Sequence, residues 1–299
     1  MKKTCTRRTF LKKAVAFSAG AFLASSFGYM YARYIEPRQL DVVEQTITSP
    51  NIPKSFDGVK ILQFSDIHLG LSYNLPLLER LVEKINVLSP DIVLFTGDLI
   101  DIPNKYPHMN KVAPILKQVY APLGKFSIFG NHDHGGYGTE MYKQIMHDSD
   151  FKLLVNEVVH VRLVDNSYIA IGGLDDIMLG RPSYDHTLGQ LSNDIFSIIM
   201  VHEPDVAQKV ALYPVDLQLS GHSHGGQIQI PFYGPLITPP LSTLYQEGMY
   251  EIGDSKMQLY VNRGLGTTRL PFRFLAKPEI TLFTLKKGES TRLAPTSMI

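Results

Sequence analysis

The chain has 299 residues, of which 44% are hydrophobic and 19% are charged. These values are typical of a globular protein with a sizeable core and exclude a disordered or repetitive chain. The net charge of +1 hides a basic head, because residues 1–13 contain six Lys or Arg and no acid, which leaves about −5 for the rest. A mildly acidic body gives no reason to expect nucleic acid as a partner. The single cysteine, Cys5, excludes a disulfide within the chain.

The first 32 residues have the pattern of an export signal. Arg7 and Arg8 are followed by Phe10, Leu11 and Lys12, and residues 14–32 contain no charge. This order resembles the bacterial twin-arginine signal, so we expect recognition by the twin-arginine export machinery and export across the cytoplasmic membrane. Small residues within the apolar stretch offer cleavage points. Its length is near the lower limit for a membrane span, so an uncleaved anchor is the alternative to a cleaved signal peptide.

Apolar runs alternate with helical patterns in the first half of the body. Residues 33–58 are predicted to form a linker and an entry strand. Strands are then expected at 59–65, 91–97 and 125–130, with helices at 75–88 and 109–119. This alternation predicts an α/β sheet with reactive loops at the carboxyl ends of its strands.

The second half is richer in strands. They are expected at 158–164, 167–173, 195–201, 216–220, 227–230, 258–262 and 279–285, with helices only at 139–147 and 203–212. The pattern predicts a second sheet packed against the first. We expect one catalytic domain over residues 40–287 and a C-terminal tail over residues 288–299.

Metal-binding side chains follow the apolar runs at the points where strands should end. The candidate ligands are Asp66, His68, Asp98, Asn131, His202, His222 and His224, and His132 lies beside them. Strand ends on one edge of a sheet share a crevice, so these groups are expected to converge. In an extended chain residues i and i+2 point the same way, which favours joint binding by Asp66 and His68.

The donor types indicate which cations fit. Oxygen and imidazole nitrogen without sulfur suit Mn, Fe or Zn better than Ca or Mg. A carboxylate such as Asp98 can bridge two cations, and two cations about 3.5–4 Å apart can hold both oxygens of a phosphoryl displacement. Gly97, Gly130 and Gly221 are expected to permit tight bends before the ligands.

The segments FSDIHLG, TGDLID, GNHDHGG, VHEP and SGHSHGGQ together resemble the calcineurin-like metallophosphoesterase superfamily. The twin-arginine head, FYGP and the tail VNRGLGTTRLPFRFLAKPEI look like its YkuE-type branch of exported phosphodiesterases. The resemblance implies a four-layer αββα sandwich of two mixed β-sheets. It also implies two divalent cations, one held by Asp66, His68, Asp98 and His224 and the other by Asp98, Asn131, His202 and His222.

The resemblance further implies a metal-dependent phosphodiesterase in which a hydroxide shared by the two cations attacks phosphorus. His132 would be the catalytic group that donates to the leaving oxygen without binding metal. Asp133 either orients His132 or is a plain loop carboxylate. His134 either lines the substrate pocket or belongs to a loop.

The substrate is less sharply indicated. Residues 230–250 are apolar and either receive a lipid tail or membrane surface, or pack on the core. Arg263, Arg269 and Arg273 either bind a second phosphate or the envelope, or form salt bridges. We expect a cell-envelope or lipid-linked phosphodiester or pyrophosphate, and contact with cell wall or membrane. The alternatives are a hydrolase like UDP-2,3-diacylglucosamine pyrophosphatase, a phosphomonoesterase, and an envelope-binding module on a degenerate fold that uses the basic tail.

Overall fold

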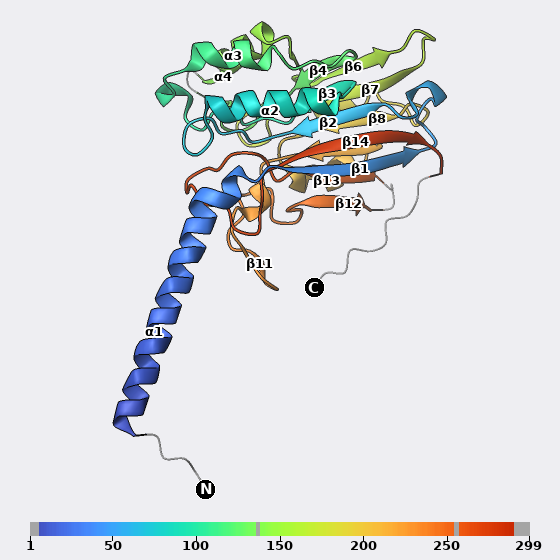
Figure 1. Ribbon diagram of the computed structural model, residues 1–299. Helices are drawn as coiled ribbons and strands as arrows, with labels where there is room; N and C mark the ends of the chain where they lie inside the picture. The colour runs from blue at the N-terminus through green and yellow to red at the C-terminus, as the bar shows by residue number, and fades with distance from the viewer. Residues whose placement is uncertain (1–5, 136–137, 254–256, 290–299) are drawn as a thin grey trace.

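Two six-stranded sheets lie face to face at the centre of the computed structural model, with helices on their outer faces (Figure 1). The model describes residues 6–135, 138–253 and 257–289. Cys5 and most of the expected C-terminal tail therefore lie outside the described residues. The architecture confirms the predicted four-layer αββα sandwich of two mixed sheets.

The first sheet has the strand order β1-β14-β2-β3-β4-β5. It is mixed, because β14 runs antiparallel to β2 while the other neighbours are parallel. Its strands are β1 (Asp41–Ser49), β2 (Lys60–Phe64), β3 (Ile92–Phe95), β4 (Gly124–Ser127), β5 (Lys152–Leu153) and β14 (Glu279–Lys287). The nine-residue β1 is the entry strand that the sequence placed within residues 33–58.

The second sheet has the order β12-β13-β9-β8-β7-β6, with parallel inner strands and antiparallel edges. Its strands are β6 (Glu157–Arg162), β7 (Tyr168–Gly173), β8 (Ser197–Met200), β9 (Leu217–Ser220), β12 (Gly248–Ile252) and β13 (Met257–Val261). A separate hairpin pairs β10 (Gln229–Ile230) with β11 (Gly234–Pro235). Strand β12 was not predicted, because its residues lie half-buried at the sheet edge and give no apolar run.

Alternating side chains of the strands separate the layers. Phe64 and Phe95 stack on each other beneath the helices that cover the first sheet. Ile61 and Ile198 instead point into the space between the two sheets. Successive strand residues face opposite sides of a sheet, so a continuous apolar run marks a strand that is covered on both faces. This is why the apolar runs predicted the inner strands well.

The helices lie mainly where the sequence placed them. They are α1 (Arg7–Met30), α2 (Leu75–Leu88), α3 (Met109–Leu116), α4 (Gly138–Asp148), α5 (Tyr184–Leu188) and α6 (Ala207–Val210). Short helical turns are η1 (Tyr31–Ile35), η2 (Glu36–Arg38), η3 (Lys54–Phe56), η4 (Pro103–Lys105), η5 (Pro204–Val206) and η6 (His224–Gly226). The side chain of Asn74 caps α2 by accepting from the Leu77 amide at 3.1 Å. The helix expected at 203–212 is shorter and is split into η5 and α6.

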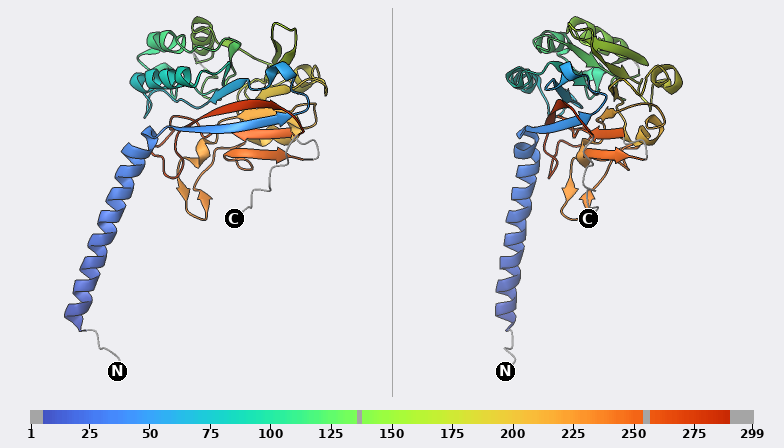
Figure 2. Two further views of the ribbon diagram at one scale, coloured as in Figure 1. Left: turned by 45° about the vertical axis from the view of Figure 1, so that its right-hand side comes forward. Right: turned by 90° about the vertical axis from the view of Figure 1, so that its right-hand side faces the viewer.

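The N-terminal helix α1 extends away from the body, and its residues are almost all exposed (Figure 2). Among the described residues no helix combines the length and apolarity needed to cross a membrane. The chain joins the body earlier than the predicted boundary at residue 40. Ala32 accepts a hydrogen bond from the Arg273 amide, and the buried Glu36 carboxylate accepts one from the Ala276 amide at 2.7 Å. The predicted linker thus begins with packed residues.

Arg273 is fully buried and binds backbone rather than carboxylates. Its guanidinium donates to the carbonyls of Arg263, Gly264, Gly266 and Ala276 at 2.6–3.1 Å, and approaches that of His224 at 3.5 Å. Burial lowers the pKa of Arg273 to about 10, which leaves the group charged at neutral pH. A single side chain therefore holds several loops beside the ends of β9 and β13.

Replacing Arg273 by Met should destabilise the protein, because the buried carbonyls would lose their donors. We expect Arg273→Met to lower the free energy of unfolding by about 3–5 kcal/mol, measured by denaturant titration. Arg273→Lys should restore only part of the loss, since an ammonium reaches fewer carbonyls. The exposed neighbour Arg269→Met is the matched control and should change little. Equal effects at the two positions would contradict this role.

Candidate metal centre

The predicted ligands converge at one edge of the two sheets. Each follows a strand: Asp66 and His68 follow β2, Asp98 follows β3, Asn131 follows β4, His202 follows β8, and His222 and His224 follow β9. Two clusters place one donor atom from each member within 4.8 Å of the others, and they are Asp66, His68 and His224, and Asp98, His202 and His222. The structure thus groups the histidines and carboxylates as the resemblance implied.

Asp98 lies between the two clusters. Its Oδ2 is 3.4 Å from Nε2 of His68 in the first cluster and 3.2 Å from Nε2 of His202 in the second. In the first cluster, Nε2 of His224 lies 3.1 Å from Nε2 of His68 and 3.3 Å from Oδ1 of Asp66. A carboxylate in this position can contact cations on both sides.

The donor set fits divalent metal ions. Oδ1 of Asn131 and Nε2 of His202 are buried and have no hydrogen-bond partner. An unpartnered buried polar atom is costly, and coordination of a cation would satisfy it. Nδ1 of His202 is held 2.6 Å from the Thr96 carbonyl, which fixes the ring so that Nε2 faces the site. Oxygen and imidazole donors of this kind bind Mn, Fe or Zn.

The site is electrostatically balanced around its carboxylates. Burial would raise the pKa of Asp98, but the charge of His202 holds it well below its usual value. Burial would lower the pKa of His202, but Asp98 raises it well above its usual range. By contrast, burial lowers the pKa of His222 and His224, which keeps both imidazoles neutral as ligands require. Cations would replace the imidazole protons beside Asp98.

The ligand backbone is left-handed rather than extended. Asp66, His68, Asp98, His222 and His224 all have φ between 45° and 67°. The expectation that residues i and i+2 of an extended chain point the same way was therefore wrong as a reason, although the side chains do converge. Tight turns at the strand ends aim them instead.

The glycines before the ligands serve mainly close approach. Gly97 has a φ of 97°, and a Cβ there would lie 2.5 Å from the Gly130 amide nitrogen. Gly130 and Gly221 have ordinary φ values, but a Cβ would clash with the carboxylates of Asp98 and Asp66 respectively. The tight bend predicted at all three positions applies to Gly97 only.

His132 lies beside the clusters and is oriented by Asp101. Its Nδ1 is 2.7 Å from the Asp101 carbonyl, which can only accept, so Nδ1 carries a hydrogen. The Asp101 carboxylate lies 3.3 Å from Nδ1 of His68. His132 also forms a metal-capable group with His68 and Asp98, so its ring can reach a phosphate bound between them. Sequence reasoning missed Asp101, which stands in the segment TGDLID three residues after Asp98.

Asp133 does not orient His132. Its buried carboxylate accepts from the backbone amides of Asp98 at 2.7 Å, Gly130 at 2.9 Å and Leu99 at 3.0 Å. These bonds tie the loop after β4 to the loop after β3. Burial and the Asp98 charge raise the pKa of Asp133 to about 7, while the backbone bonds favour its ionised form. Both readings offered by the sequence were wrong.

His134 points away from the metal clusters. Its Nε2 lies 2.7 Å from Oδ1 of Asp175, and its ring packs against Phe129. The other basic candidates separate as well. Arg263 forms ion pairs with Glu279 at 2.6 Å and Asp41 at 3.6 Å, whereas Arg269 is exposed at the mouth of the metal cavity.

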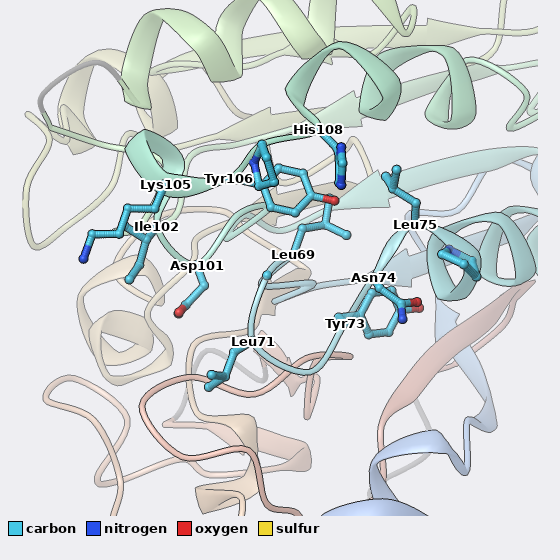
Figure 3. A pocket seen from close by; sticks show the side chains of 13 residues that line it. Leu69, Leu71, Tyr73, Asn74, Leu75, Asp101, Ile102, Lys105, Tyr106 and His108 are labelled. Carbon is cyan, nitrogen blue, oxygen red and sulfur yellow. The ribbon is translucent and has the colours of Figure 1, made fainter.

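A cavity of about 230 Å³ opens onto the clusters. Its inner end is lined by His68, Asp98, Asn131, His132, His222 and His224, and its mouth by Met178, Ile228, Leu236, Ile237, Arg269 and Leu270. A second cavity, of about 560 Å³, lies behind Asp101 and is lined by Leu69, Tyr73, Ile102 and Tyr106 among others (Figure 3). The second cavity contains no predicted ligand, so the smaller one is the candidate reaction site.

The model of the calcineurin-like phosphoesterase family matches residues 59–226, more than half of the chain. The chain belongs to the calcineurin-like phosphoesterase family. It is 54% identical over 284 residues to an "Uncharacterized metallophosphoesterase YkuE" of Bacillus subtilis (strain 168), covering 95% of this chain and 99% of that protein. The YkuE-type branch predicted from the sequence is thereby confirmed.

Two further relatives are more distant calcineurin-like phosphoesterases. One is an "Uncharacterized metallophosphoesterase Cj0846" of Campylobacter jejuni, 33% identical over 251 residues, with 82% of this chain and 63% of that protein covered. The other is "UDP-2,3-diacylglucosamine pyrophosphatase LpxG" of Chlamydia muridarum, 30% identical over 310 residues, with 85% and 92% covered. Membership of this family and the clusters together indicate a metal-dependent phosphoesterase.

Removing a predicted ligand should weaken metal binding. We expect His202→Ala to lower the affinity for Mn or Zn at least about 10-fold, because a change in the surroundings of a ligand alone costs that much. Metal content after dialysis, measured by plasma mass spectrometry, would show the loss. His160→Ala is the control, because this exposed imidazole lies on β6 away from the clusters. Unchanged metal content in His202→Ala would remove it from the ligand set.

Proposed function

We propose that the chain is a dinuclear metal-dependent phosphodiesterase that hydrolyses a lipid-linked or cell-envelope phosphodiester or pyrophosphate. One observation carries the proposal. Oδ2 of Asp98 lies 3.4 Å from His68 and 3.2 Å from His202, which belong to different clusters. This is the position of a carboxylate shared by two cations. When bound, such cations neutralise phosphate oxygens and make water a better nucleophile at neutral pH.

The chain's own residues would orient the substrate and move the proton. Asp98 also accepts the His132 amide at 2.8 Å, which ties the catalytic loop to the bridging carboxylate. Because Nδ1 of His132 donates to the Asp101 carbonyl, Nε2 can donate only when the ring is an imidazolium. The nearby Asp101 carboxylate, 3.8 Å from Nδ1, favours that charged form. Nε2 would then give its proton to the leaving oxygen.

Two observations favour a phosphoester with an apolar portion. The mouth of the cavity carries the apolar side chains of Leu236, Ile237 and Leu270, and Arg269 is the cation that lines it. One relative is described as a pyrophosphatase of an acylated sugar nucleotide. A hydrolase of that kind is the second candidate. All seven predicted ligands remain and gather near the cavity, which argues against a degenerate binding module.

We also propose export by the twin-arginine machinery. Arg7 and Arg8 open α1, and residues 14–32 carry no charge. Phe10, Leu11 and Lys12 follow the arginine pair in the order expected of such a signal. Export would bring the enzyme to substrates of the envelope rather than to cytoplasmic nucleotides. Contact with cell wall or membrane follows from that location.

The choice between diester and monoester can be tested directly. With Mn added, we expect faster hydrolysis of bis-p-nitrophenyl phosphate than of p-nitrophenyl phosphate, measured by nitrophenolate release. The reverse ratio would support a phosphomonoesterase. The absence of metal-dependent hydrolysis on either compound would refute the enzyme proposal and revive the binding module.

His132→Ala should retain metal but lose turnover. General acid catalysis typically contributes about 10²–10⁴-fold, so we expect a loss in that range on a diester with an alkyl leaving group. The loss should be smaller with p-nitrophenolate, which leaves without a proton. The control is His134→Ala, because that imidazole bonds Asp175 and does not line the cavity. Equal losses with both leaving groups would exclude the acid role.

A further inference from the structure

The loop after the metal centre carries an exposed apolar surface. On the β10–β11 hairpin, Phe232 is 98% and Tyr233 is 76% exposed. Leu236, Ile237 and the neighbouring Leu270 are also more than half exposed. We call these five residues the hairpin face. The sequence-based alternative, that this stretch packs on the core, was wrong for these side chains.

The hairpin face lacks the charges that normally accompany exposed loops. Residues 225–246 contain no Asp, Glu, Lys or Arg. A contiguous exposed apolar surface of this kind marks an interaction site or a membrane contact. Phe232 and Tyr233 are aromatic, and aromatic rings are enriched where proteins meet the membrane–water boundary. No carboxylate in the hairpin would have to leave water if lipid covered it.

The hairpin face adjoins the metal cavity. Leu236, Ile237 and Leu270 belong to both, and Arg269 stands at the same mouth. The loop then returns to the metal centre, where the Pro240 carbonyl lies 2.8 Å from Nε2 of His222. An object resting on the hairpin face would therefore present its nearest groups to the cavity, with a cation at the rim for a phosphate.

The base of the hairpin and the base of α1 share one segment of chain. Tyr29 at the end of α1 contacts the ring of Phe272 at 5.4 Å between centroids, and Tyr31 contacts Phe274 at 6.3 Å. The Phe274 backbone in turn exchanges hydrogen bonds with Gln227 and Gln229 at 2.8 Å. The α1 helix and the hairpin extend from the same side of the body in every view (Figures 1 and 2).

Helix α1 repeats the character of the hairpin face. Its apolar side chains are exposed, among them Phe10, Leu11, Val15, Phe17, Phe22, Leu23 and Phe27. Its far end is basic, with Arg7, Arg8, Lys12 and Lys13 and no acid. Two adjoining apolar surfaces, one of them ending in positive charge, complement an anionic lipid bilayer better than a protein partner.

We propose that the hairpin face docks on the surface of a lipid bilayer, with Phe232 and Tyr233 entering its outer layer and the metal cavity facing the headgroups. The docking surface goes beyond phosphoester hydrolysis, because it states where the cavity meets its surroundings. It involves no residue assigned to the metal centre. Phe232 and Tyr233 do not line the cavity.

The chain contains no tryptophan, so a single introduced indole reports on one place. The full-length Phe232→Trp variant would be mixed with vesicles of phosphatidylglycerol and phosphatidylcholine, with and without bromine on the phosphatidylcholine chains. We expect its emission to shift to shorter wavelength on the vesicles and to lose intensity with the brominated lipid. Thermal unfolding without vesicles would verify that the variant is folded.

Val164→Trp is the matched control. Val164 is fully exposed in the turn between β6 and β7, and β7 runs parallel to β8, so this turn lies at the opposite end from His202. Its emission should not change, even if α1 binds the vesicles. Identical behaviour of the two variants would overturn the proposal. So would a concentration-dependent shift of Phe232→Trp without lipid, which would indicate a second copy of the chain. Neither readout depends on hydrolysis, so a failure here is distinct from failure of the phosphodiesterase assay.

Discussion

The metal centre depends on one buried guanidinium. Arg273 donates to backbone carbonyls of the loop after β13, including those of Gly264 and Gly266. That loop in turn bonds the ligand loop, because the Gly266 amide donates to the Asp66 carbonyl at 2.7 Å. A carbonyl cage satisfies a buried cation without a carboxylate that would compete for metal. The same arginine fixes the chain entry, since its own amide donates to Ala32 at 2.9 Å. The anchor helix and the first metal ligand are thus joined through a few hydrogen bonds.

Backbone strain is concentrated at the ligands. Five of the seven predicted ligands have left-handed φ values, and none of them is Gly or Asn. Each such residue costs about 1–2 kcal/mol, so the conformation persists only where other contacts determine it. Some of these contacts are visible: the Asp66 amide donates to Gly97 and the His68 amide to Asp98 at 2.9 and 3.2 Å. Asp133 adds bonds to the Asp98 loop. The scaffold therefore offsets strain at the place where side chains must converge on cations.

The sequence predicted the sandwich and the grouping of the ligands, because both follow from local pattern. Apolar runs such as that of β3 mark inner strands, and polar residues at their ends share a crevice. Contacts that depend on three-dimensional approach were not predicted. Arg273 carries no local sign that it will be buried, and the Pro240 carbonyl has no sequence signature at all. The left-handed turns were missed for the same reason, since Asp and His are not typical of that conformation. Exposure of Phe232 was also hidden, because an apolar residue is more often buried.

The size of the metal cavity bears on what the enzyme can hold. At about 230 Å³ it is smaller than the roughly 300–1,000 Å³ of sites that enclose a drug-sized ligand. An acylated substrate would not fit inside, so only its phosphate and adjoining groups would enter. The remainder would have to lie against Leu236, Ile237 and the rest of the hairpin face. If that face rests on a bilayer, the acyl chains need not leave the lipid, and only the phosphate must rise to the cations. The small polar cavity and the broad apolar mouth are then two parts of one solution to hydrolysis at a lipid surface.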